Sequence, residues 1–162
     1  MQPRISDAPT IDLRRTPRDL TAAQLDDLNL ARADLSGINA VSARFRRVDL
    51  RQADLRESRL LRAQLTEVDL RGADLSAADV RDARLVGCDL RGARLVAIDL
   101  RGTRVVGCTL AGAQLTGADL SAALLVDVDL RGADLSGARV TDVVGDVRWN
   151  AATTWPEGVR PG

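Results

Sequence analysis

The stretch VDLRGADLS occurs at residues 68–76 and again, letter for letter, at residues 128–136. The same five-residue pattern fills the chain between the two copies and extends beyond both. From residue 25 to residue 140 every fifth residue is apolar, and 19 of these 24 positions hold leucine. The residue two places earlier in each unit is small or apolar, except at Ser58 and Thr103. The chain is therefore built from repeated five-residue units, and this repeat decides the fold class.

A period of five fits neither a helix nor a flat strand. In an α-helix a five-residue step turns the apolar position by about 140°, so the leucines would form no stripe. In a strand the side chains alternate with a period of two, so successive leucines would point to opposite faces. The pattern fits a chain that turns a corner in every unit. The central residue and the residue two before it then point inward, and the other three positions point outward.

A weaker period of 20 residues sets the number of sides. The larger residues two places before the central position recur at this interval, at Val48, Val68, Cys88, Cys108 and Val128. Four units per turn place like residues above like, whereas three units would mix valine with alanine. The sequence therefore predicts a four-sided parallel solenoid with coils about 4.8 Å apart, and residues 21–143 give about six coils at that spacing.

These units resemble the pentapeptide-repeat family, whose consensus is A(D/N)LXX. The resemblance covers about three-quarters of the chain. It implies an all-β fold, a right-handed quadrilateral parallel β-helix. It does not by itself imply a function, because one fold serves many functions.

The two ends of the chain depart from the repeat. All five prolines lie outside residues 21–143, as expected if the amides of the repeat bond to neighbouring coils. We assign residues 1–20 to an N-terminal lead-in or cap and residues 144–162 to a C-terminal cap and tail. Trp149 and Trp155, in this tail, are expected to close the apolar end of the core.

The start of the repeat has two interpretations. Residues 16–24 fit a short capping helix, with Thr16 as N-cap and Pro17 at the first helical position. They also fit a first repeat unit, because Leu20 and Leu25 keep the five-residue period. The sequence leaves both open.

The composition excludes several classes of function. Basic and acidic residues balance at 23 each, so no bulk charge draws the chain to nucleic acid or to a membrane. Histidine and tyrosine are absent, which removes the usual general base and the commonest metal ligand. We expect no catalytic residue, metal or cofactor, and a non-enzymatic protein. Without a signal peptide or an apolar run of membrane-spanning length, and partly from the family resemblance, we expect a soluble bacterial cytoplasmic protein.

Most charged residues form a regular outer pattern. Aspartate and arginine flank the central leucine at Asp49/Arg51, Asp69/Arg71, Asp89/Arg91 and Asp129/Arg131. Each pair is expected on one outer side, where it compensates itself and adds little stability. Cys88 and Cys108 occupy inner positions one coil apart, and we interpret them as small buried residues rather than a disulfide.

A few outward positions hold apolar residues. Val86, Val106 and Val126 take the position after the central residue on one side of three successive coils, and Leu124 joins them there. Val96 lies on the next side. A stacked apolar patch suggests an interface. We hypothesise a homodimer in which Val86, Val106, Leu124 and Val126 pack against their two-fold copies.

Two functions fit these features. The first is a protein-interaction rod with an unspecified partner. The second follows from resemblance to the branch of the family that binds DNA gyrase or topoisomerase IV: a mimic of DNA that protects against topoisomerase poisons. Such a mimic needs a row of carboxylates. Asp119, Asp127 and Asp129 form a candidate acidic zone, because the chain carries no basic residue between Arg104 and Arg131.

Overall fold

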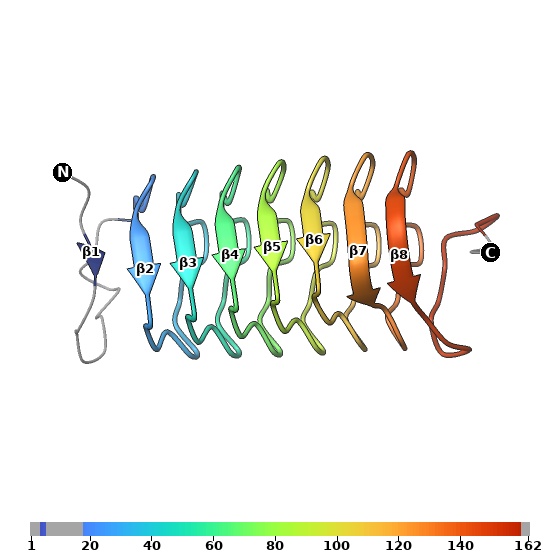
Figure 1. Cartoon of the computed structure of the whole chain (residues 1–162), viewed down its shortest axis with the longest axis horizontal. Coiled ribbons are helices and arrows are strands. Elements are labelled where there is room, and N and C mark those ends of the chain that lie inside the picture. The colour runs from blue at the N-terminus through green and yellow to red at the C-terminus, as the bar shows by residue number, and fades with distance from the viewer. Residues whose placement is uncertain (1–3, 6–17, 160–162) are drawn as a thin grey trace.

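The protein is a solenoid of parallel β-strands stacked along one axis (Figure 1). The computed structural model describes residues 4–5 and 18–159. Its eight strands pair in chain order within one sheet. They are β1 (Arg4–Ile5), β2 (Gln24–Asp26), β3 (Arg44–Arg46), β4 (Gln64–Thr66), β5 (Arg84–Val86), β6 (Arg104–Val106), β7 (Leu124–Asp129) and β8 (Val144–Arg148). The sheet forms one side of the solenoid, which we call the strand side.

Each turn of the solenoid takes 20 residues. On the strand side Leu25 pairs with Phe45, and Phe45 pairs with Leu65. The other sides are joined by single parallel bridges at the same interval, such as those of Asp49 with Asp69 and with Asn29. The four-sided parallel β-helix of about six turns that the repeat predicts is confirmed.

The corners recur every five residues and share one backbone conformation. The last residue of the unit has a left-handed φ, for example 54° at Ala97 and 68° at Gly112. Fifteen residues other than glycine adopt this conformation, so the coil geometry imposes it whatever the side chain. The aspartate of the unit supports the turn, as at Asp49, whose Oδ1 accepts the Arg51 amide at 3.0 Å.

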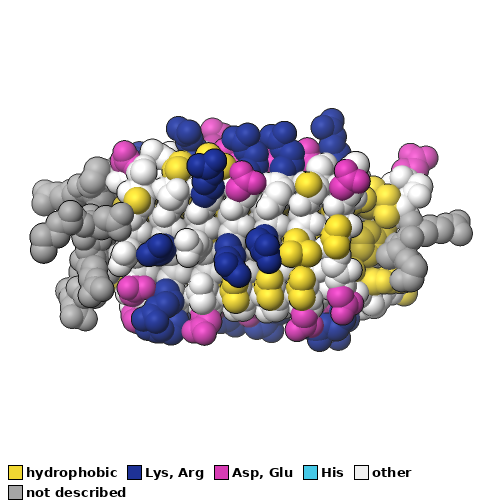
Figure 2. All heavy atoms as spheres, turned by 45° about the horizontal axis from the view of Figure 1, so that its top comes forward, with side chains coloured by type: hydrophobic (Ala, Val, Ile, Leu, Met, Phe, Trp, Pro, Cys, Tyr) yellow, Lys and Arg dark blue, Asp and Glu magenta, His cyan; other side chains and the backbone are white. Residues whose placement is uncertain are grey.

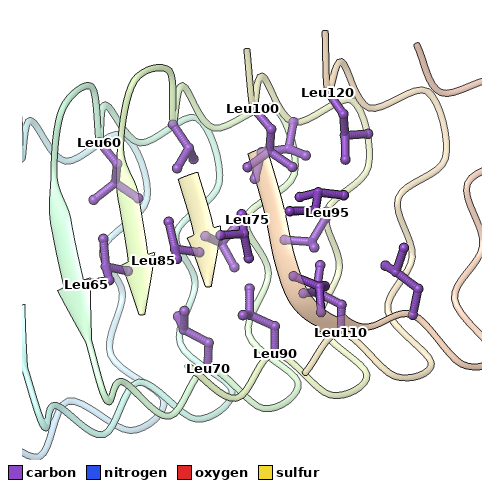
Figure 3. Close-up of a pocket in the computed structure, with 16 residues that line it drawn as sticks. Leu60, Leu65, Leu70, Leu75, Leu85, Leu90, Leu95, Leu100, Leu110 and Leu120 are labelled. Carbon is purple, nitrogen blue, oxygen red and sulfur yellow. The ribbon is translucent and has the colours of Figure 1, made fainter. Parts of the chain in front are cut away.

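The interior holds the two inward positions of every unit. Leucines from successive coils stack in columns and point into the core (Figure 3). A void of about 20 Å³ between them has room for a single water at most. Cys88 and Cys108 are buried free thiols, and the Cys88 amide donates to the Cys108 sulfur at 3.3 Å. The predicted inward positions are confirmed, with partial exposure at Ala33 and Val140.

The first coil answers the question left open at the N-terminus. Asp19 forms a parallel bridge with Asn39, and Leu20 is buried in the core. Residues 18–24 are therefore the first repeat and not a helix. In the N-terminal lead-in, the backbone of β1 pairs with that of β2. Residues 1–3 and 6–17 lie outside the described part of the chain.

The coil continues after the five-residue period stops. β8 pairs with β7, and Thr154 forms a bridge with Asp134. The register shifts by one residue between Leu125 and Val128 of β7, so that Val147 rather than residue 148 lies beside Val128. The segment assigned to a cap from residue 144 thus begins as one more strand of the sheet.

Candidate protein-interaction surface

The outer face of the strand side consists of two columns of side chains. One column precedes the central residue of each strand, and the other follows it. The preceding column runs Gln24, Arg44, Gln64, Arg84, Arg104, Leu124 and Val144. The following column runs Asp26, Arg46, Thr66, Val86, Val106 and Val126.

From β5 onward the following column is apolar. Val86 is in register with Val106, and Val106 with Val126. Leu124 lies on the same face of β7, so the structure places all four residues predicted for the patch together. Figure 2 shows these apolar side chains gathered in adjacent rows, with basic side chains beside them.

The structure adds Val144 to this surface. Its partner in the register is Leu124, and its side chain is 63% exposed. Sequence reasoning missed Val144 because the five-residue period no longer assigns it a position. We use "apolar patch" for Val86, Val106, Leu124, Val126 and Val144.

Arginines beside the patch lack acidic partners. Arg84 and Arg104 are exposed and share a column with Leu124. Neither forms an ion pair with any residue that the structure describes, and the same holds for Arg44 on β3. These guanidinium groups are therefore available to a partner.

The sides without named strands behave differently. Arg51 contacts Asp49 at 2.6 Å and Asp69, one coil on, at 3.7 Å. Corresponding 2.6 Å pairs join Arg71 to Asp69 and Arg91 to Asp89. The predicted self-compensating pairs are confirmed. Mainly through the arginine hydrogen bond, they hold the pKa of Asp69 and Asp89 below the ordinary range.

The candidate acidic zone is not free of positive charge. Arg139 lies 3.8 Å from Asp119, and Arg148 lies 3.3 Å from Asp127. These arginines follow much later in the sequence, but the 20-residue coil brings them alongside. The expectation of an uncompensated zone, which counted neighbours along the chain, is therefore wrong.

Asp129 is the least accessible of the three carboxylates. It is 5% exposed, and Arg131 donates to it at 2.6 Å. This hydrogen bond lowers the pKa of Asp129 to about 2. A buried, paired carboxylate is poorly placed to contact a cationic groove, so the DNA-mimic hypothesis gains no supporting contact here.

The C-terminal end of the core contains an apolar cavity of about 230 Å³. Trp155 and Val143 line it together with the last core leucines. Trp155 packs against the core as the sequence predicts, but its indole N–H is buried without a partner in the described structure. The rings of Trp149 and Trp155 stand edge to face with their centroids 6.2 Å apart, and the Trp149 side chain is 43% exposed.

The described residues hold neither a cluster of metal-binding side chains nor a membrane-spanning helix. No group of three His, Cys, Asp or Glu side chains there could hold a metal ion. Within the same residues, no helix is long and apolar enough to cross a membrane.

Comparison with known protein families agrees with the repeat. The family model for pentapeptide repeats matches residues 19–56, 43–82, 69–109 and 106–142, which together span residues 19–142. The chain belongs to the pentapeptide-repeat family. No curated protein sequence is significantly similar to this member of the family.

Solved structures of pentapeptide-repeat proteins resemble this family member. HetL of Nostoc sp. strain PCC 7120, described as involved in the regulation of heterocyst differentiation, is 29% identical with a TM-score of 0.49; the match covers 77% of this chain and 63% of HetL. A thylakoid lumen protein of Arabidopsis thaliana is 28% identical with a TM-score of 0.47, over 58% of this chain and 69% of its own. QnrB1, a plasmid-mediated fluoroquinolone resistance protein, is 21% identical with a TM-score of 0.41, over 87% of each chain.

Proposed function

We propose that this pentapeptide-repeat protein is a non-enzymatic rod that binds another protein through the apolar patch on its strand side. The observation that carries the proposal is the stacking of outward apolar side chains on four consecutive strands, from the half-buried Val86 on β5 to the exposed Val144 on β8. Contiguous apolar patches on soluble surfaces commonly mark contact sites. A rod that repeats one coil offers such a patch a flat and rigid support.

A homodimer is one way to cover the patch. Light scattering tests it directly on the wild type and on a Val106→Glu, Val126→Glu double variant. A dimeric wild type that becomes a folded monomer in the variant would identify the partner as a second copy. A monomeric wild type would assign the patch to another protein.

A comparative pulldown from the native host tests the proposed function itself. The baits are the wild type, the Val106→Glu, Val126→Glu variant and the control Val96→Glu, which adds a carboxylate to a half-buried valine on the neighbouring side. We expect a protein retained by the wild type and the control but lost from the double variant. If the double variant keeps every protein that the wild type retains, including copies of itself, the patch is not the contact surface.

The alternative function, binding of gyrase or topoisomerase IV by mimicry of DNA, finds less support in the geometry. It needs carboxylates that face outward without compensation. Asp119, Asp127 and Asp129 each have an arginine within 4 Å, whereas Arg84 and Arg104 of the strand side are unpaired among the described residues.

A further inference from the structure

The strand side combines an apolar column and a cationic column over several consecutive coils. Val86, Val106 and Val126 form an apolar column along the axis, while Arg84 and Arg104 form a cationic column two residues away on the same strands. Both arginines are exposed and have no acidic partner among residues 18–159. The remaining surface neutralises most of its arginines with aspartate, whereas Arg84 and Arg104 lie unpaired beside the apolar column.

A partner that covers both columns must present apolar and acidic groups side by side. Carboxylates suit the guanidinium groups, because charge-assisted hydrogen bonds to arginine can be bidentate. Apolar side chains suit the valine column, because they remove it from water. An uncharged apolar partner would instead bury Arg84 or Arg104 without a counter-ion, which is costly.

The spacing of the columns favours a helix lying along the rod. Neighbouring strands are about 4.8 Å apart, and one turn of an α-helix rises about 5.4 Å. Over the three rungs from Val86 to Val126 the two repeats drift by only about 1 Å. Residues at i, i+4 and i+7 of such a helix can therefore meet successive valines, while acidic residues on its flank meet the arginines.

We propose that the apolar patch binds an acidic amphipathic helix of another protein. Its apolar stripe lies on Val86, Val106 and Val126, and its carboxylates pair with Arg84 and Arg104. This inference rests on the proposed function and names the chemistry of the partner.

A second copy of this chain fits the same surface less well. The carboxylates in the strands of this side are Asp26 and Asp146 at its two ends and Asp127 and Asp129 late in β7. Asp26, Asp127 and Asp129 already contact arginines of their own chain. A two-fold copy packed over β5 and β6 would therefore bring arginine or apolar residues to Arg84 and Arg104.

The test uses three labelled synthetic peptides and fluorescence anisotropy. Each peptide has about 18 residues, enough to support a helix, with a leucine stripe flanked by glutamate, glutamine or lysine. The proteins are the wild type, Arg84→Glu with Arg104→Glu, and the control Arg59→Glu with Arg62→Glu, which changes two exposed arginines outside the strands of this side. Circular dichroism checks that each variant folds.

We expect the wild type and the control to bind the glutamate peptide at least about tenfold more tightly than the glutamine peptide, and less tightly as salt is added. The Arg84→Glu, Arg104→Glu variant should lose this preference and bind the lysine peptide instead. Such a reversal requires direct contact, because mere loss of structure would not create binding of the opposite charge.

Two results would overturn the inference. Equal binding of the glutamate and glutamine peptides would show that the arginines are not used. Absence of peptide binding, together with a wild-type dimer that Val106→Glu and Val126→Glu separate, would assign the patch to a second copy. In both cases the proposed function stands, since it falls only when the double valine variant keeps every partner in the pulldown.

Discussion

At the scale of single residues, Ser58 and Thr103 are the two hydroxyls among the otherwise apolar inner positions of the repeat. The Thr103 hydroxyl donates to the carbonyl oxygen of Val80 at 2.8 Å. The Ser58 hydroxyl is equally buried but has no partner among the described residues. An unpaired buried hydroxyl destabilises the fold by roughly 1–3 kcal/mol, so two similar residues have opposite energetic roles.

This difference predicts opposite effects of removing each hydroxyl. Ser58→Ala should raise the free energy of unfolding by about 1 kcal/mol, because it deletes an unsatisfied group. Thr103→Val should lower the free energy of unfolding by about 1 kcal/mol, because it removes the shorter of the two hydrogen bonds to the Val80 carbonyl and leaves only that of the Ala83 amide. Urea unfolding measures both. A Ser58→Ala protein that is markedly less stable than wild type would show that the hydroxyl has a partner in solution.

Asp129 predicts a specific acid sensitivity. Its folded pKa of about 2 lies below the ordinary value of 3.8, so its stabilising effect is complete above about pH 4 and is lost as the pH falls towards 2. The shift corresponds to about 2 kcal/mol at neutral pH. Asp129→Asn should remove this part of the pH dependence of unfolding, whereas Asp127→Asn, at an exposed carboxylate, should leave it in place. Identical pH profiles for wild type and Asp129→Asn would refute the assignment.

Sequence reasoning succeeded for inward residues and failed for Asp129. The five-residue period alone assigns Leu90 or Ala93 to the core, and both are buried. Asp129 has the same place in its unit as the half-exposed Asp89, yet it is 5% exposed. The difference arises because β8 pairs with the end of β7. The five-residue repeat does not predict β8.

At the scale of the elements, the corner is the device that turns the chain four times per coil. Left-handed φ is costly for residues with a Cβ atom, by roughly 1–2 kcal/mol, and nearly free for glycine. The sequence nevertheless places alanine, arginine or an acidic residue at many corners. The hydrogen bonds between coils therefore fix the corner more strongly than local preference does.

Exchanging glycine and alanine at two corners tests this account. Gly112 has φ of 68° and open space where a Cβ would stand, so Gly112→Ala should lower the free energy of unfolding by about 1 kcal/mol through strain alone. Ala97 has φ of 54°, and Ala97→Gly should raise the free energy of unfolding by roughly 0.5 kcal/mol. Thermal or urea unfolding checks both. The same sign of change for the two variants would contradict the corner assignment.

The last strand marks the limit of prediction at this scale. A Cβ at Gly145 would stand 1.6 Å from the carbonyl oxygen of Leu125, so only glycine allows β8 to approach β7 there. The sequence offers Gly145 as one glycine in a tail without a period. Its role, and the addition of Val144 to the apolar patch, became visible only once the strands were paired.

At the scale of the whole molecule, charge and apolar surface are distributed unevenly around the rod. Asp–Arg pairs recur along the sides outside the sheet. The strand side instead carries unpaired arginines next to five apolar residues (Figure 2). The sequence predicted four of these residues, because Val86, Val106 and Val126 recur at outward positions at intervals of 20 and Leu124 takes another outward position on the same side. It could not show which arginines lack partners, since that depends on contacts between coils.

The central claim, that the strand side is the contact surface of this rod, is tested most directly by photo-crosslinking in the native host. A photoreactive phenylalanine analogue is placed at position 106 on the strand side and, in a separate variant, at position 96 on the neighbouring side. We predict a crosslinked partner at position 106 that is absent at position 96 and that disappears when Val126 is changed to Glu. Crosslinking at position 96 alone, or the same products at both positions, would contradict the claim.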